Sequence, residues 1–255
     1  MRPTRIPVGD LRFDALTQHQ VTEVVRKAWA DGRGGSIIPV NIDVAFAASR
    51  DAALADLIDR GSLVVADGMP LVWAARLRGE PLPERVAGSS LIRPLSAAAA
   101  ADGKSVYVFG GADGIPEKAA AELAAQYPTL RIAGTQSPEF GFDKTDDGAR
   151  RAMAAVVASA PDLVFVGLGF PRQEQLIEQL RRQLPGTWFL ACGGGIGMTA
   201  GAVRRASPLI QRLGFEWVHR LLQEPRRLAR RYLRDDLPFA LALVIRSVWQ
   251  RFRRG

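Results

Sequence analysis

The sequence predicts an α/β fold, with a Rossmann-like, mostly parallel sheet, helices on both faces and a basic amphipathic helical C-terminal appendage. Short apolar runs that suit buried strands alternate some six times with longer segments that suit helices, and this alternation is typical of parallel sheets. Several of the runs end in glycine-rich turns, which often precede a helix in such sheets. The composition changes after residue 203, where arginine becomes abundant. We therefore expect an α/β body over residues 1–203 and an appendage over residues 204–255.

Turn and cap signals set the order of the elements. Asp31-Gly32 ends the first predicted helix, Asp43 can cap the helix after the first strand, and Pro70 suits the first turn of a later helix. The first half is expected to contain helix 17–31, strand 36–40, helix 44–55, strand 63–65, a helix from residue 70, helix 91–101 and strand 105–109. The second half is expected to contain helix 117–126, strand 130–133, helix 145–158, strand 163–166, helix 173–184, strand 188–191 and a run of small residues over 192–201.

Asp67 is the first candidate for chemistry. The apolar run Leu63-Val64-Val65 stops at Ala66-Asp67-Gly68, so Asp67 stands at the carboxyl end of a strand, where open α/β sheets bind their ligands. The segment Glu84-Arg85-Val86-Ala87-Gly88 then returns Arg85 to the same neighbourhood before the next helix. The alternative is structural, because an aspartate after a strand often serves as a turn or cap residue and an arginine before glycine as a surface cation.

Glycine-rich turns follow three other predicted strands, at Gly110-Gly111, Gly167-Leu168-Gly169 and Gly193-Gly194-Gly195. Backbone amides in such turns, and the N-termini of the helices after them, are natural phosphate sites. Tight turns that allow close packing are the alternative explanation. Neither Gly-x-Gly-x-x-Gly nor a Walker pattern is present, which argues against a nucleotide-dependent oxidoreductase.

The composition argues against a metal site and against export. The chain has two histidines and one cysteine, Cys192, and it contains no Asp-x-Asp, so neither a zinc site nor a metal held on a diphosphate is expected. A single cysteine excludes an intramolecular disulfide and agrees with a reducing compartment. The N-terminal stretch lacks the apolar core of a signal peptide, and no apolar run is long enough to span a bilayer. We expect a cytoplasmic protein without metal or other cofactor.

The appendage carries the net charge of the chain. Residues 201–255 hold thirteen arginines, no lysine and four acids, whereas residues 1–200 are about neutral. An amphipathic helix is expected over 209–224 and is broken at Pro225. A basic stripe at helical spacing then consists of Arg226, Arg227, Arg230, Arg231 and Arg234.

The last segment restarts at Pro238 and combines apolar residues such as Trp249 and Phe252 with Arg246 and Arg253. This pattern is typical of a helix that lies in the interface of an anionic membrane. The alternative is a C-terminal helix docked on the body or on a second copy of the chain, which would make the protein a homo-oligomer. Nucleic acid is not an expected partner, because residues 226–234 contain no aromatic residue apart from Tyr232.

Several motifs together resemble the WecG/TagA/CpsF glycosyltransferases (family 26), bacterial enzymes that elongate lipid-linked sugars. The motifs lie in order from about Asn41 to Tyr232 and span three quarters of the chain. They are Ala66-Asp67-Gly68-Met69-Pro70, Glu84-Arg85-Val86-Ala87-Gly88, Val108-Phe109-Gly110-Gly111, Pro161-Asp162-Leu163, Val166-Gly167-Leu168-Gly169-Phe170-Pro171-Arg172-Gln173-Glu174, Ala200-Gly201 with Arg205-Ala206, and Glu216-Trp217, Arg220-Leu221, Glu224-Pro225 and Arg231-Tyr232.

The resemblance implies a metal-independent inverting transferase with a UDP-sugar donor and a polyprenyl-diphosphate-linked acceptor, acting in exopolysaccharide or cell-surface polysaccharide synthesis. By position, Asp67 would be the general base, Asn41 and Arg85 would line its pocket, and Gln173 would hold the nucleotide. The remaining expected substrate-binding residues are Gly110, Gly111, Gly169, Glu174, Gly194 and Gly195.

In the family the appendage closes over the active site and meets the membrane, so the resemblance implies a peripheral protein on the inner face of the cell membrane. The arginines of the family's appendage correspond here to Arg220, Arg227 and Arg230. They are expected to stabilise the leaving diphosphate, since a catalyst without a metal needs cations where negative charge develops.

Two departures from the family pattern concern donor recognition. Gly197 stands where the family often has an aspartate, and Pro39 stands two residues before Asn41, where many members have threonine. We therefore expect UDP-glucose or another UDP-hexose as the donor. The alternatives are a UDP-N-acetylmannosamine(uronate) transferase of the same family and a non-catalytic membrane- or polymer-binding protein.

Overall fold

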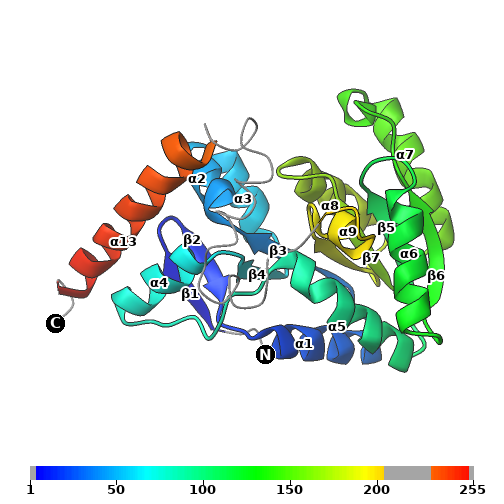
Figure 1. The fold of residues 1–255 in the computed structure, drawn as a ribbon, viewed down its shortest axis with the longest axis horizontal. Coiled ribbons are helices and arrows are strands. Elements are labelled where there is room, and N and C mark those ends of the chain that lie inside the picture. Colours follow the sequence, from blue (N-terminus) through cyan, green and yellow to red (C-terminus); the bar gives the residue numbers. More distant parts are fainter. Residues whose placement is uncertain (1–3, 204–230, 253–255) are drawn as a thin grey trace.

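The centre of the molecule is a six-stranded parallel sheet flanked by helices (Figure 1). The computed structural model describes residues 4–203 and 231–252. In spatial order the strands are β4 (Leu63–Ala66), β3 (Gly35–Val40), β8 (Trp188–Ala191), β7 (Leu163–Gly167), β5 (Ser105–Gly110) and β6 (Arg131–Gln136). The described helices of the body are α1 (Gln18–Ala30), α2 (Ile42–Arg50), α3 (Ala52–Asp59), α4 (Met69–Arg78), α5 (Gly88–Ala101), α6 (Ile115–Gln126), α7 (Asp146–Ser159), α8 (Arg172–Gln183) and α9 (Gly195–Thr199).

Alternate side chains of the strands enter two separate cores, because successive residues of a strand point to opposite faces of the sheet. In β5, Val106 and Val108 belong to a core shared with α1, α5, α6 and α9. Tyr107 and Phe109 belong to the opposite core, shared with α2, α4, α7 and α8. The expected α/β fold, a parallel sheet with helices on both faces, is therefore confirmed.

The prediction of one continuous helix over residues 44–55, capped by Asp43, is wrong on both points. Asn41, not Asp43, caps α2, because the Asn41 Oδ1 accepts a hydrogen bond from the Val44 N–H at 3.0 Å. The chain breaks again at Asp51, which is extended and caps α3 through the Ala53 N–H at 2.8 Å. Asp43 lies instead in the first turn of α2, where a negative charge favours the helix dipole.

An N-terminal hairpin was not foreseen from the sequence. The strands β1 (Arg5–Val8) and β2 (Leu11–Asp14) pair antiparallel around Gly9, whose φ is 61°. The buried Asp14 ties this hairpin to the edge of the sheet, since its Oδ2 accepts a hydrogen bond from the Val64 N–H of β4 at 2.7 Å. The edge strand is thus covered, which protects it from pairing with another chain.

Pro39 lies inside β3, although proline is uncommon in a central strand. The pairing of β3 with β8 ends at Ile37, whereas the pairing with β4 continues to Val40. Pro39 therefore lies beyond the last residue that β8 pairs, where a missing N–H removes no ladder hydrogen bond on that side.

The described part of the tail docks on the body. After a π-helical turn (Arg231–Asp236), α13 (Leu237–Phe252) runs beside α4 at one end of the molecule (Figure 1). Leu243 and Ser247 are buried, and the ring of Phe239 lies 5.4 Å from that of Phe46 in α2. The outward face of α13 is apolar and exposed, and it consists of Leu237, Leu241, Ile245, Trp249 and Phe252.

The sequence left two roles open for this helix, binding to a membrane and docking on the body. The structure shows that one face of α13 docks on the body. Within residues 4–203 and 231–252, no helix has the length and apolar character to cross a membrane. The division expected at residue 203 stays a prediction, because the helix expected over 209–224 lies outside the described residues.

Candidate active site

Asp67 and Asn41 lie side by side at the carboxyl edge of the sheet. The Asp67 N–H donates to the carbonyl of Val40, the last residue of β3, at 2.8 Å, and Asn41 follows Val40 directly. Asn41 uses its carbonyl oxygen to cap α2, which leaves its NH₂ group to donate. This corner therefore presents a carboxylate and an amide donor from two neighbouring strands.

Arg85 reaches the same corner through the main chain. The Val86 N–H donates to the carbonyl of Ala66 at 2.8 Å, and the Arg85 Nη1 lies 3.5 Å from the Asp67 Oδ1. The side chains of Arg85 and Asp67 are 15% and 26% exposed. Asp67 is thus held by its neighbours and still reachable from solvent, as a base that takes a proton from a substrate must be.

A hollow of about 540 Å³ opens at the carboxyl ends of β5, β6 and β7. Two of its lining residues come from the predicted glycine turns, Gly111 after β5 and Gly167 at the end of β7. The remaining lining residues are Ala112, Asp113, Ser137, Pro138, Glu139, Phe140, Leu168 and Arg172. The hollow is open, and its position agrees with the rule that α/β sheets bind ligands at this edge.

The loop after β6, residues 137–140, lines this hollow and was not predicted from the sequence. Phe140 is highly exposed, with the Lys144 ammonium 5.6 Å from the centre of its ring. Arg172 is fixed at the other side of the hollow by a 2.7 Å contact of its Nε with the Asp143 Oδ2. Ser137 directly follows β6, so the strand-end rule would have pointed to this loop. The sequence predicted that this strand ends at residue 133, whereas β6 continues to Gln136, so the loop that begins at Ser137 was not recognised as a strand end.

Gly110 and Gly111 have φ values of 104° and 102°, which glycine adopts readily and other residues rarely adopt. A Cβ on Gly110 would also lie 2.5 Å from the carbonyl oxygen of Gly167. Close packing of β5 on β7 therefore accounts for Gly110, whereas the exposed Gly111 faces the hollow. Gly169 has a φ of 79°, and its carbonyl accepts from the Gln173 N–H at 3.1 Å as α8 begins.

Gln173 and Glu174 form a buried network at the start of α8. The Gln173 Nε2 donates to the Glu174 Oε1 at 2.9 Å, and the Gln173 Oε1 accepts from the Gly193 N–H at 3.1 Å. Glu174 is 2% exposed and its Oε2 is buried without a hydrogen-bond partner in the described part of the chain. Burial raises the pKa of Glu174 to about 7, and the hydrogen bond from Gln173 opposes this shift.

The small-residue turn after β8 combines an exposed and a buried glycine. Gly194 is exposed, whereas Gly195 is buried against α5, because a Cβ there would lie 2.9 Å from the Ser89 Cα. The neighbouring Cys192 thiol is buried, and burial raises its pKa to about 12. A thiol with this pKa is not a nucleophile at neutral pH. Packing thus accounts for Gly195, and only Gly194 is open to a ligand.

The remaining predicted residues, Arg220, Arg227 and Arg230, lie outside the described residues. Their contact with a leaving diphosphate stays a prediction. Among residues 4–203 and 231–252, no three His, Cys, Asp or Glu side chains are grouped so that they could hold a metal ion.

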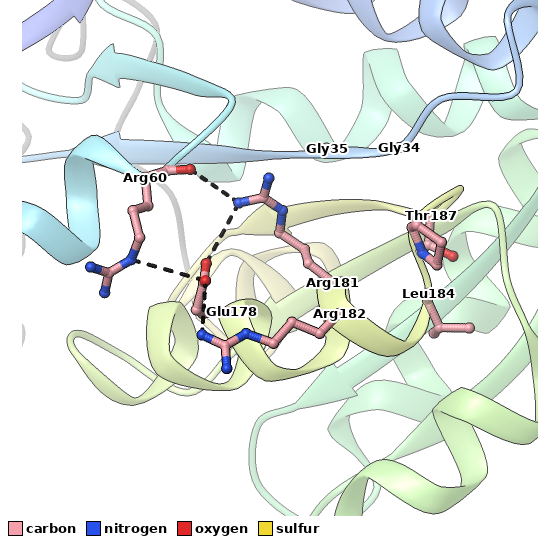
Figure 2. A pocket seen from close by; sticks show the side chains of 9 residues that line it. Gly34, Gly35, Arg60, Glu178, Arg181, Arg182, Leu184 and Thr187 are labelled. Carbon is pink, nitrogen blue, oxygen red and sulfur yellow. Dashed lines mark hydrogen bonds and ion pairs between the residues drawn. The ribbon is translucent and has the colours of Figure 1, made fainter.

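A second hollow, of about 380 Å³, lies at the opposite, amino edge of the sheet. Figure 2 shows Arg60, Arg181 and Arg182 converging on Glu178 beside Gly34 and Gly35. The arginines come from the C-terminal ends of α3 and α8, where helix dipoles attract cations. Helix ends and Glu178 together account for this cluster, so we assign it a structural role.

Comparison with known proteins identifies relatives over most of the chain. A protein named N-acetylglucosaminyldiphosphoundecaprenol N-acetyl-beta-D-mannosaminyltransferase from Bacillus subtilis is 30% identical over 82% of this chain and 79% of its own length. A protein of the same name from Bacillus spizizenii is 30% identical over 88% of this chain and 85% of its own. One from Staphylococcus aureus is 27% identical over 89% and 87%. The sequence pattern of the family described as "Glycosyl transferase WecG/TagA/CpsF family" matches residues 6–254, and the chain therefore belongs to this family.

Proposed function

We propose that the protein transfers a sugar from a UDP-sugar to a saccharide linked to a polyprenyl diphosphate. The family match over nearly the whole chain carries this proposal. The names of the relatives give undecaprenyl-diphosphate-linked N-acetylglucosamine as their acceptor, and we infer an acceptor of the same class here.

N-acetylmannosamine is the donor sugar that the relatives support best. Each of the three relatives described above is named as an N-acetylmannosaminyltransferase, whereas nothing among them favours the UDP-hexose expected from Gly197 and Pro39. We therefore propose UDP-N-acetylmannosamine as the first donor to test, with UDP-glucose as the competing donor.

In the proposed reaction an acceptor hydroxyl attacks the anomeric carbon of the donor in a single displacement, which inverts that carbon. Asp67 takes the hydroxyl proton while the bond from the anomeric carbon to UDP breaks, and UDP leaves with the bonding electrons. A positioned base of this kind supplies on the order of 10² to 10⁴ in rate. Arg85, 3.5 Å from the carboxylate, holds Asp67 in place, and the appendage arginines would stabilise the charge that develops on the diphosphate.

We also propose that the outward face of α13 rests on an anionic membrane. Leu237, Leu241, Ile245, Trp249 and Phe252 recur at about every fourth residue and are exposed, and the exposed Arg246 and Arg251 lie on the same helix. Apolar and aromatic side chains flanked by arginine suit the headgroup layer. This arrangement would hold the active site close to a lipid-linked acceptor.

The test is UDP release by the full-length protein from UDP-N-acetylmannosamine, UDP-glucose and related UDP-sugars, with an undecaprenyl-diphosphate-linked N-acetylglucosamine acceptor. The proposal expects UDP release that depends on acceptor and is lost in Asp67→Asn. Vesicle binding with no donor consumed would refute it and favour a non-catalytic membrane-binding protein. Acceptor-dependent release that survives in Asp67→Asn would refute the assignment of the base alone.

A further inference from the structure

We propose that Glu174 is a positioning residue for the donor, which fixes the orientation of the Gln173 amide and, through it, the turn after β8. The inference rests on the proposed function, because it concerns the part of the site that a UDP-sugar would occupy. It also changes the role of Glu174, which the sequence placed among the residues that contact substrate.

Glu174 is too deeply buried to serve as a surface contact. It is 2% exposed, one carboxyl oxygen accepts from Gln173 and the other has no hydrogen-bond partner in the described part of the chain. A buried polar atom without a partner costs about 1–3 kcal/mol. Because an apolar side chain of similar size would avoid this cost, the carboxyl group needs a functional explanation.

The hydrogen bonds of Gln173 supply that explanation. Its side-chain amide has an oxygen that accepts and a nitrogen that donates, and the two ends have nearly the same shape. The Gly193 N–H can only donate and therefore selects the oxygen, at 3.1 Å. The Glu174 Oε1 accepts and therefore selects the nitrogen, at 2.9 Å. Together they permit one orientation, and without Glu174 the nitrogen end of the amide would lose its fixed partner.

The turn that this network holds lies between the two parts of the candidate site. Gly193 follows β8, which is flanked by β3 on the Asp67 side and by β7 on the side of the 540 Å³ hollow. The turn is packed closely on β7, since a Cβ on Gly167 would lie 2.8 Å from the Gly193 carbonyl oxygen. A donor with its nucleotide in the hollow and its sugar at Asp67 must pass this turn. A shift of Gly193 would therefore weaken donor binding.

UDP binding by calorimetry tests the inference on the full-length protein. Glu174→Met and Gln173→Met remove the acceptor and the amide while keeping length, and each should weaken UDP binding by roughly 10- to 100-fold, as loss of a supporting hydrogen bond does at metal sites. The double variant should lose no more than either single variant, because both changes break one unit. Glu174→Gln keeps an oxygen that can accept, so it should bind UDP within about threefold of the wild type. Gln175→Met, at an exposed position of the same helix, is the matched control.

Two further readouts separate positioning from a role in stability alone. In turnover assays the KM for the donor should rise in Glu174→Met while the KM for the acceptor stays unchanged. Hydrogen exchange at the Gly193 amide should be faster in Glu174→Met and Gln173→Met and unchanged in Glu174→Gln. If Glu174→Met fails to fold, Gln173→Met and Glu174→Gln carry the same comparison.

The outcomes distinguish the inference from the proposed function. A wild-type protein that does not bind UDP would overturn the donor class and the inference with it. A wild type that binds UDP, with Glu174→Met binding equally well, would overturn the inference and leave the function intact. Additive losses in the double variant would also overturn it, because Glu174 and Gln173 would then act independently.

Discussion

Glu174 makes the stability of the protein depend on pH in a direction that its burial determines. An ordinary glutamate has a pKa of 4.5, and burial raises that of Glu174 to about 7. An acid whose pKa is raised by folding binds its proton more tightly in the folded state, so protonation favours folding. The wild-type protein should therefore lose stability as the pH rises from about 4.5 through about 7. At about 1.4 kcal/mol per pH unit, the loss contributed by this one group is on the order of 3 kcal/mol above pH 7.

Glu174→Gln removes the titration while keeping the shape of the side chain. Urea unfolding at pH 5, 6, 7 and 8 measures the effect as a free energy of unfolding. The variant should gain stability over the wild type as the pH rises, by up to about 3 kcal/mol at pH 8, and the two proteins should differ least at pH 5. Glu122→Gln makes the same chemical change at an exposed position of α6, so comparing the two variants isolates the effect of burial. If the free energy of unfolding of wild type and of Glu174→Gln changed in parallel between pH 5 and 8, burial would not raise the pKa of this carboxyl group.

Three other predictions follow from the site and the tail. Asp67→Asn should lower kcat by roughly 10² to 10⁴. It should change the free energy of unfolding little, because asparagine keeps the shape of the side chain and an oxygen that can accept from the partly buried Arg85. Activity above a tenth of wild type would refute the assignment of Asp67 as the base. Gly110→Ala should cost roughly 2–5 kcal/mol, from its positive φ and the 2.5 Å approach to a carbonyl oxygen. Gly103→Ala, with a φ of 65° and open space, should cost about 1 kcal/mol in the same urea titration. Ile245→Glu and Trp249→Glu should leave the free energy of unfolding unchanged and weaken binding to phosphatidylglycerol vesicles, measured by co-sedimentation, by about tenfold. Unchanged binding would show that the outward face of α13 does not contact the membrane.

The parallel sheet could be predicted because fully buried strands are continuous apolar runs with a turn residue at each end. The apolar pattern does not show which of two neighbouring polar residues caps a helix. Asn41 and Asp43 are both good caps, and only the backbone of β3, which is extended through Asn41, decides that Asn41 is the cap. The hairpin around Gly9 escaped notice because its strands have four residues each, too short for a clear alternation of polar and apolar residues.

The candidate site was predictable where a functional residue directly follows a strand, as Asp67 and Asn41 do. The same rule does not find a buried residue that orients another site residue through a hydrogen bond. Glu174 belongs to a motif typical of the family, yet sequence alone does not show whether a side chain in the first turn of α8 faces a ligand or the core. Its place behind Gln173 depends on how α8 packs on the sheet, which is a tertiary property.

A comparison of Gly197, one of the two departures from the family pattern, with the nearby Gly195 shows whether packing requires a glycine at either position. Gly195 is required by packing, because a Cβ there would lie 2.9 Å from both Ser89 and Ile92 of α5. A Cβ on Gly197 would meet only a Val203 methyl group, at 3.7 Å, within the described part of the chain. The fold therefore accepts a side chain at Gly197, and the absence of the aspartate common in the family is not a consequence of packing.

Gly197→Asp should accordingly leave the free energy of unfolding within about 1 kcal/mol of wild type, since α9 is helical at this position and aspartate is at least as good a helix former as glycine. If this position selects the donor, the variant should change the ratio of kcat/KM for UDP-N-acetylmannosamine and UDP-glucose by roughly tenfold or more, the range that one polar contact contributes. Gly186→Asp controls for the added charge, since a Cβ on Gly186 would meet only the Gly32 carbonyl oxygen, at 3.8 Å, within the described part of the chain. A stable Gly197→Asp protein with an unchanged ratio would show that donor choice is set elsewhere, and the 540 Å³ hollow with its exposed Phe140 would then be the first place to look.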